Sequence, residues 1–555
     1  MKKSVILILF AISFSCQEKY EPQKPAVTLW EPYNDSTEVA ANQNHENKRM
    51  RYKQIQSKVL DKNDVFLPLY GEVSKFSEKE YERMKPLVLE QDIFTLQKHI
   101  VEKKYTYEKL VLFYLYRIYR YELDNSATLN TVIALNANVV KEARAKDEEI
   151  AEGLEVRHPI YGMPILLKDN VNTSGMKTTA GAIALMDNEV DDAFIVKRLK
   201  ENGALILGKV NLSEWANYLC DCPNGQSAVG GQTLNPYGRR VFDTGGSSAG
   251  SGTSMAANYA AGAVGTETSG SILSPSSQNS IVGLKPTIGL LSRTGIVPIS
   301  STLDTPGPMT RNIMDNAILL TAMLGKDNAD PKSIEGSIDI LSMTMHQRKF
   351  KDMRLGAIKP LLESDSIYKA TVEKMRLLGA EIIEFVPPEV SMQGFLSILN
   401  IDMLNDLPEY LSTQVKDKNA VNITSVADVV AFNTADSSIR IPYDQARLDG
   451  ILADSISIEE LEKIKSTLEK NGRTFFDAAM DEHKLNAVLS INNYHAGFAA
   501  VAKYPALTVP MGYKPNGEPI GLTFIGKPFK EADLLRMGRA FEAAFQVRKV
   551  PKGYE

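Results

Sequence analysis

The sequence predicts an α/β fold, and the first observation behind this prediction is a strand-helix-strand pattern before the middle of the chain. Residues 162–169 and 204–209 are apolar runs that each end in charge, which is typical of a buried strand. Residues 194–199 lie between them and have helical spacing. A strand, a helix and a second strand in this order form a β-α-β unit, which indicates a sheet covered by helices.

The second observation is a hairpin near the C-terminus. Asn516-Gly517 is a strong two-residue hairpin signal, and the apolar residues 507–509 and 522–525 flank it as strands. A final helix follows, because large apolar residues recur on one face of residues 534–545.

The remaining elements are predicted from periodicity. Residues 93–100 and 110–118 are amphipathic helices, and Thr106 is a suitable N-cap for the second. Residues 134–153 are predicted as a third helix, and we expect these three helices to cover one face of the core. The region 320–480 carries the least information.

Within that region, one short pattern is clear. Residues 355–358 and 382–385 are predicted strands on either side of a helix at 366–378.

Composition excludes one class of partner. The chain has 555 residues, of which 43% are hydrophobic and 24% charged, as in an ordinary globular enzyme. The formal net charge of −5 provides no basic footprint for nucleic acid. We therefore expect no nucleic-acid partner.

The N-terminus is typical of an export signal. A short basic start precedes an apolar stretch that is too short to span a bilayer, and small residues then stand just before Cys16. This pattern resembles a bacterial lipobox, so residues 1–15 are predicted as a lipoprotein-type signal peptide and Cys16 as the lipidated residue. Plain secretion with cleavage nearby and an uncleaved anchor are the alternatives. The polar residues 16–88 are predicted as a tether and N-terminal extension.

Two further cysteines, Cys220 and Cys222, are separated by one residue. In an oxidising compartment a disulfide between them is one outcome, although the ring would be tight, and the sequence leaves this open. No metal site is predicted, because no histidine lies near them.

Three segments are candidates for chemistry. Lys168 closes an apolar strand, where partial desolvation lowers the pKa of an amine and allows it to act as a base. Residues 245–250 are rich in glycine and serine, and residues 265–272 could form a nest of main-chain N–H groups that favours an oxyanion. Taken singly, each also fits a surface lysine, a turn before a helix or a loop of small residues.

Together these segments resemble the amidase signature family. The serine- and glycine-rich stretch from Gly245 to Ser271, followed by residues 280–287, is similar to the family signature, and the interval between Ser247 and Ser271 is the usual one. Further blocks are similar to family landmarks: residues 162–170, 178–181, 208–215 and 304–309. The resemblance implies one large α/β/α domain over 89–548 with a mixed, twisted central sheet, the amidase signature fold.

The resemblance also implies roles for single residues. Ser271 matches the nucleophile, Ser247 the bridging serine that follows a cis peptide bond from Gly246, and Lys168 the base. The main-chain N–H groups of the nucleophile loop match the oxyanion hole, which comprises Thr268, Ser269, Gly270 and Ser271. The implied activity is hydrolysis of a carboxylic amide to an acid and ammonia or an amine through an acyl-enzyme, without metal or organic cofactor.

Two departures from the family pattern refine this hypothesis. Many members have aspartate where this chain has Glu267, and glycine where it has Ser269. Glu267, Phe432-Asn433 and residues 441–445 are similar to the peptide amidase branch, whose substrates are C-terminal peptide amides and related amides. The expected partner is therefore a small-molecule or peptide amide, and the expected location is the periplasm or cell surface, with the membrane contacted only through a lipid at Cys16.

Three competing interpretations remain. Residues 246–250 also satisfy the G-x-S-x-G pattern of an esterase elbow with Ser248 as nucleophile, and His483 or His495 would then be the partner. An amidotransferase A-type subunit, which supplies ammonia during transfer-RNA charging, shares the whole signature. A catalytically silent surface-binding protein could use the same scaffold.

Overall fold

The structure is a computed structural model of the chain. It describes residues 28–555 except 338 and 347, so the predicted signal peptide and Cys16 lie outside the described residues. Within that part of the chain, no helix combines the length and the apolar character that crossing a bilayer requires.

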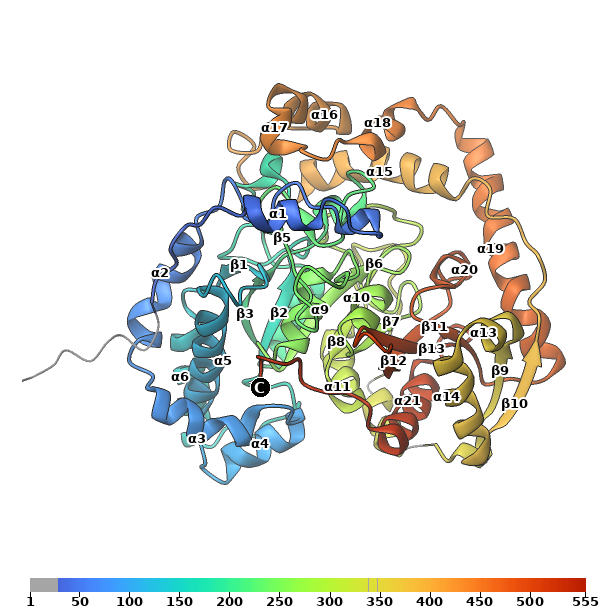
Figure 1. Cartoon of the computed structure of the whole chain (residues 1–555), viewed down its shortest axis with the longest axis horizontal. Coiled ribbons are helices and arrows are strands. Elements are labelled where there is room, and N and C mark those ends of the chain that lie inside the picture. Colours follow the sequence, from blue (N-terminus) through green and yellow to red (C-terminus); the bar gives the residue numbers. More distant parts are fainter. Residues whose placement is uncertain (1–27, 338, 347) are drawn as a thin grey trace, which may run out of the picture.

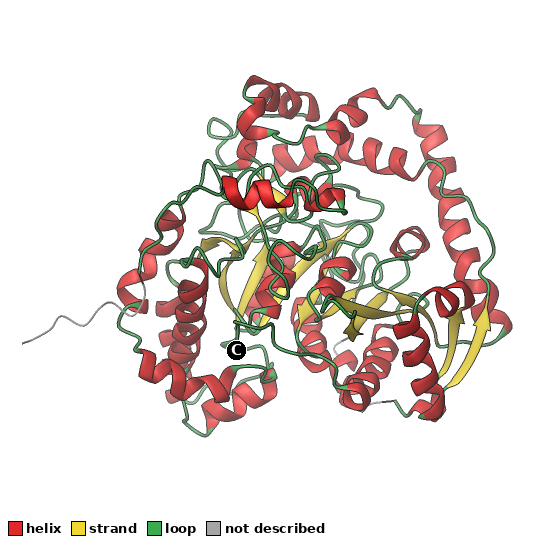
Figure 2. Ribbon diagram, viewed as in Figure 1, coloured by secondary structure: helices red, strands yellow, loops and turns green. Residues whose placement is uncertain are grey.

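A large mixed sheet runs through the centre of the molecule, with helices around it (Figure 2). In spatial order its strands are β1 (Val132–Leu135), β3 (Leu205–Val210), β2 (Pro164–Lys168), β6 (Gly262–Glu267), β8 (Thr305–Thr310), β7 (Val282–Lys285), β12 (Ala506–Tyr513), β13 (Pro519–Ile525), β11 (Ala487–Ile491), β9 (Arg354–Ile358) and β10 (Glu381–Phe385). Two short strands, β4 (Gln226–Ser227) and β5 (Gly231–Gln232), pair with each other outside this sheet. The predicted α/β class and the mixed sheet are confirmed.

The helices surround the sheet in chain order (Figure 1). Before β6 they are α1 (Ser36–Asn42), α2 (Lys62–Val73), α3 (Glu78–Val88), α4 (Ile93–Val101), α5 (Tyr107–Glu122), α6 (Val139–Ala151), α7 (Phe194–Glu201), α8 (Glu214–Asn217) and α9 (Ala249–Ala256), with short 3₁₀ turns at Lys48–Met50 and Ile183–Leu185. After it they are α10 (Leu273–Gln278), α11 (Ile313–Met323), α12 (Asp339–Met345), α13 (Lys359–Ser364), α14 (Ser366–Leu377), α15 (Phe395–Thr413), α16 (Val426–Ala435), α17 (Ser437–Arg440), α18 (Ala446–Ala453), α19 (Ile458–Glu482), α20 (Ala496–Ala502) and α21 (Glu531–Phe545), with a 3₁₀ turn at Phe350–Asp352.

The predicted β-α-β unit is β2, α7 and β3, and its two strands are parallel. Strand β6 pairs with β2 in parallel on the other side, so the carboxyl ends of β2 and β6 meet at one edge of the sheet. Both faces of β6 are covered: Gly262 approaches Leu319 of α11, whereas Gly265 approaches Ser248 beside α9. This burial explains why β6 is built from small residues.

The predicted helix at 134–153 is wrong at its start. Residues Val132–Leu135 form β1, which pairs with β3 in antiparallel fashion, and helix α6 begins only at Val139. The edge of the sheet recruits these four apolar residues, because pairing with β3 outweighs their local preference. The C-terminal hairpin of β12 and β13 and the helices α4, α5 and α21 are confirmed, and Thr106 caps α5 through its hydroxyl.

Residues 28–88 pack against the domain. The Asn42 side chain donates a hydrogen bond to the carbonyl of Arg240 at 2.9 Å, and the Ile55 carbonyl accepts one from the Gln232 N–H at 2.8 Å. Met50 and Ile55 are buried. This segment therefore lies beside the loop that leads into the glycine- and serine-rich stretch.

Helices α15 to α19 form a separate cap, seen in orange at the top and right of Figure 1. Their apolar residues share a core with the turn that follows α8, including Trp215, Cys220 and Cys222. The two cysteines are joined by a disulfide, which settles the pairing that the sequence left open.

Candidate active site

Lys168 is the last residue of β2 and is fully buried. Its amine lies 2.7 Å from Ser247 Oγ, 2.8 Å from Thr266 Oγ1 and 3.1 Å from the Thr266 carbonyl oxygen. Two acceptors and one hydroxyl suit a neutral amine, which has two N–H donors and one lone pair. The geometry therefore allows the Ser247 hydroxyl to donate its proton toward the lysine.

Burial lowers the pKa of Lys168 to about 7, and the charges of Asp304 and Glu267 oppose this shift. An ordinary lysine has a pKa of about 10.4. A substantial fraction of Lys168 is then uncharged near neutral pH, which is the state that a general base requires.

Ser247 sits on the loop before α9 and follows a cis peptide bond from Gly246. The carbonyl of Ser247 accepts a hydrogen bond from the Ser213 N–H at 3.0 Å, and the side chain is inaccessible to solvent. The structure thus has the cis bond that the family resemblance implies, on the residue that contacts Lys168.

Ser271 follows β6, just before α10, and is 8% exposed. Its carbonyl accepts a hydrogen bond from the Ser248 N–H at 3.1 Å, which ties the two serine loops together. Among the described residues, the Ser271 hydroxyl has no hydrogen-bond partner, and no bond joins it to the Ser247 hydroxyl. The structure therefore brings Lys168 and Ser247 into contact and places Ser271 on the adjoining loop.

The predicted oxyanion donors are free in the described residues. None of the main-chain N–H groups of Thr268, Ser269, Gly270 and Ser271 donates a hydrogen bond to another part of the chain. Gly270 has a φ of 89°, a conformation that suits glycine and turns the chain into α10. Four consecutive unpaired donors form a ready site for negative charge.

Glu267 fixes the other side of this loop. One carboxylate oxygen accepts hydrogen bonds from the N–H groups of Ile272 at 2.7 Å and Leu273 at 3.0 Å. Those two groups are the first free donors of α10, so the carboxylate occupies them and leaves the earlier donors of the loop unoccupied.

The esterase-elbow interpretation fails on geometry. Ser248 is fully buried, and its hydroxyl donates to the Thr266 carbonyl at 3.1 Å. His495 contacts Ser490 instead, and His483 follows the end of α19, so neither histidine is bonded to Ser248. Ser248 supports the β6 strand end.

Sequence reasoning missed Thr266, which supplies two of the three contacts of Lys168. Asn170 also donates to the Thr266 hydroxyl at 3.0 Å, so the threonine is held between two residues of the β2 end. A prediction that β2 and β6 are parallel neighbours would have found it, because their carboxyl ends then lie side by side.

A cavity of about 510 Å³ adjoins this site. Asn170, Thr266 and Thr268 line its inner wall, and the loop 293–306 and α15 line the rest. Such a volume lies in the range that holds a small organic ligand. In the described part of the chain, no group of three or more His, Cys, Asp or Glu side chains is placed to hold a metal ion.

Comparison with known proteins gives the same family throughout. The profile of the Amidase family matches residues 109–440. A protein described as a probable amidase from Arabidopsis thaliana is 36% identical, covering 81% of this chain and 89% of its own. The crystal structure of the native peptide amidase from Stenotrophomonas maltophilia is 35% identical with a TM-score of 0.78, covering 83% of this chain and 98% of its own.

A more distant relative belongs to the amidotransferases. In Zymomonas mobilis, the A-type subunit of the glutamyl-tRNA(Gln) amidotransferase is 30% identical, covering 77% of this chain and 92% of its own. The family match spans more than half of the chain and agrees with the sheet and with the resemblance stated from the sequence. This chain is therefore a member of the amidase signature family, a hydrolase that acts on amides.

Proposed function

We propose that the enzyme cleaves a carboxylic amide through an acyl-enzyme on Ser271, with Ser247 and Lys168 as the proton route. The observation that carries this proposal is the 2.7 Å contact between the amine of buried Lys168 and the Ser247 hydroxyl. A serine hydroxyl is a weak nucleophile until a base accepts its proton.

The steps balance without any group beyond these residues and water. Neutral Lys168 accepts the Ser247 proton as Ser247 accepts the Ser271 proton, and Ser271 attacks the amide carbon. The N–H groups of residues 268–271 stabilise the oxyanion, each such donor being worth about 2.7–4 kcal/mol in related systems. Ser247 then returns a proton to the departing nitrogen, and water releases the acid from Ser271.

For the substrate, we propose an amide that includes C-terminal peptide amides among its class. The 35% identity to a peptide amidase and the adjoining 510 Å³ cavity support this choice. The test is turnover of a panel of aryl amides, simple primary amides and peptide amides by the purified protein, with Ser271→Ala as the control. Turnover of none of them, in protein whose Ser271 is accessible to a phosphonylating reagent, would contradict the substrate class.

The 30% identity to an amidotransferase component favours one alternative function. An ammonia-supplying component would hydrolyse glutamine, and would do so efficiently only with its partner proteins present. Comparing glutamine with peptide amides for the isolated chain separates the two functions. A silent surface-binding protein would show no turnover of either.

We further propose export and lipid anchoring at Cys16. The basic start, the short apolar stretch and the small residues before Cys16 support this proposal. Expression of the full chain with Cys16→Ser should move the protein from the detergent phase to the aqueous phase in a phase-separation assay. An unchanged partition would contradict lipidation at this residue.

A further inference from the structure

The N-terminal extension reaches the loop that carries Ser247. Arg49, in the 3₁₀ turn after α1, donates from Nη1 to the side-chain oxygen of Asn224 at 3.0 Å. Arg49 lies outside the 109–440 match to the Amidase family. The contact therefore joins a segment outside that match to the family core.

Asn224 stands directly behind the cis peptide bond. A Cβ placed on Gly246 would lie 2.8 Å from the Asn224 side-chain oxygen, so the amide packs against the residue that precedes Ser247. The same amide donates to both carboxylate oxygens of Asp243, at 3.0 and 3.1 Å, and Asp243 accepts the Gly245 N–H at 2.7 Å. Two routes thus lead from Asn224 to the Gly245-Gly246 pair.

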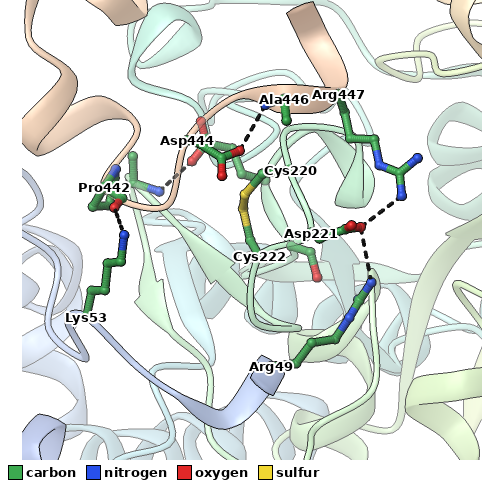
Figure 3. Close-up of a disulfide and its surroundings, with 12 residues drawn as sticks. Arg49, Lys53, Cys220, Asp221, Cys222, Pro442, Asp444, Ala446 and Arg447 are labelled. Atoms are coloured by element: carbon green, nitrogen blue, oxygen red, sulfur yellow. Dashed lines mark hydrogen bonds and ion pairs between the residues drawn. A yellow bond between two sulfur atoms is a disulfide. The ribbon is translucent and has the colours of Figure 1, made fainter. Parts of the chain in front are cut away.

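A disulfide-bridged turn stands on the outer side of Arg49. Cys220 and Cys222 close a turn that presents Asp221 outward, between Arg49 and Arg447 of α18 (Figure 3). The Asp221 carboxylate lies 3.7 Å from Arg49 and 2.8 Å from Arg447, and its side chain is 74% exposed. Exposed pairs of this kind contribute little stability, so the Asn224 bond is the contact that matters for Arg49.

We propose that Arg49 is a positioning residue for the Gly246–Ser247 loop, acting through the side chain of Asn224. The inference rests on the proposed role of Ser247. Without Arg49, the Asn224 oxygen loses its donor beside Gly246, the amide can rotate, and the Ser247 hydroxyl loses its fixed place between Lys168 and Ser271. Small misplacement of a catalytic group is costly, because reaction depends on near-attack geometry.

The test compares Arg49→Met with Arg447→Met in the full protein. Both variants lose an ion pair to the same Asp221 carboxylate, but only Arg49 contacts Asn224. Arg49→Met should lower kcat roughly 10-fold with KM nearly unchanged, Arg49→Lys should recover most of the loss, and Arg447→Met should stay within about 2-fold of wild type. Equal effects of the two methionine variants would overturn the proposal.

A second measurement covers a misfolded variant or an unknown substrate. The rate at which a fluorophosphonate modifies Ser271 needs no substrate, and it should fall with Arg49→Met and with Asn224→Ala. The double variant should react no more slowly than the slower single variant, because the two residues act in series. Additive losses would contradict the proposal. Absence of labelling in wild type would contradict the proposed function instead.

Discussion

Lys168 and Lys209 end the neighbouring parallel strands β2 and β3, and neither side chain is exposed to solvent. Lys209 lies 3.1 Å from the carboxylate of Asp169 and also donates to the Val171 carbonyl and the Thr178 hydroxyl. Among the described residues, Lys168 forms no ion pair and contacts Ser247 and Thr266 instead. Burial lowers the pKa of both lysines.

The difference teaches that burial alone does not make a lysine a base. The Asp169 charge favours the protonated state of Lys209, so its ammonium is held as part of a buried ion pair. Lys168 has only neutral oxygen partners, one of which is a serine with a proton to give. Lys209 is therefore interpreted as structural and Lys168 as chemical.

The largest expected effect comes from Lys168→Met. This change keeps the length of the side chain and removes the amine, so kcat should fall by roughly 10²–10⁴-fold, the usual contribution of a general base. Steady-state kinetics with an active amide, together with an unchanged unfolding midpoint in urea, would check it. A variant with full activity would remove the basis of the proposed mechanism.

Lys209→Met should reverse that pattern. It leaves the buried Asp169 carboxylate without its cation, and breaking such a pair typically costs about 3–5 kcal/mol. Urea unfolding should therefore show a clearly lowered free energy of unfolding. If the variant kept its stability and instead lost only kcat, the roles assigned to the two lysines would have to be exchanged.

Lys285 provides the smallest effect and sharpens the comparison. It is a third buried lysine, at the end of β7, and its amine has no hydrogen-bond partner in the described residues. Burial lowers its pKa to about 8, while Glu267 and Glu531 oppose the shift. Because Lys285→Met removes a buried amine that no group satisfies, the free energy of unfolding should change by less than about 1 kcal/mol in urea unfolding, and a larger loss would contradict this view.

Much of the site was predictable because its residues lie in short motifs. Lys168, Ser247 and Ser271 were assigned from the family resemblance, and the cis bond before Ser247 was part of that assignment. Strand order was not predictable, so Thr266 was given no role. Its position beside Lys168 depends on the pairing of β2 with β6, about 100 residues apart.

The outer part of the site could not be predicted for the same reason. Arg49 reaches Asn224 from 175 residues away in sequence, and nothing in the local pattern of the extension indicates this contact. The Cys220–Cys222 pairing also depended on the conformation of a single turn. The error at residues 132–135 arose from sheet pairing too, since four apolar residues fit a helix and an edge strand equally well.

The central claim is that Lys168 acts as a base near neutral pH, and the pH dependence of kcat/KM tests it most directly. The base is active only when deprotonated, so activity should rise with pH and level off above an apparent pKa of about 7. Parallel fluorophosphonate labelling of Ser271 should follow the same curve. A rise centred near the ordinary lysine pKa of about 10.4, or no dependence on pH, would contradict the account.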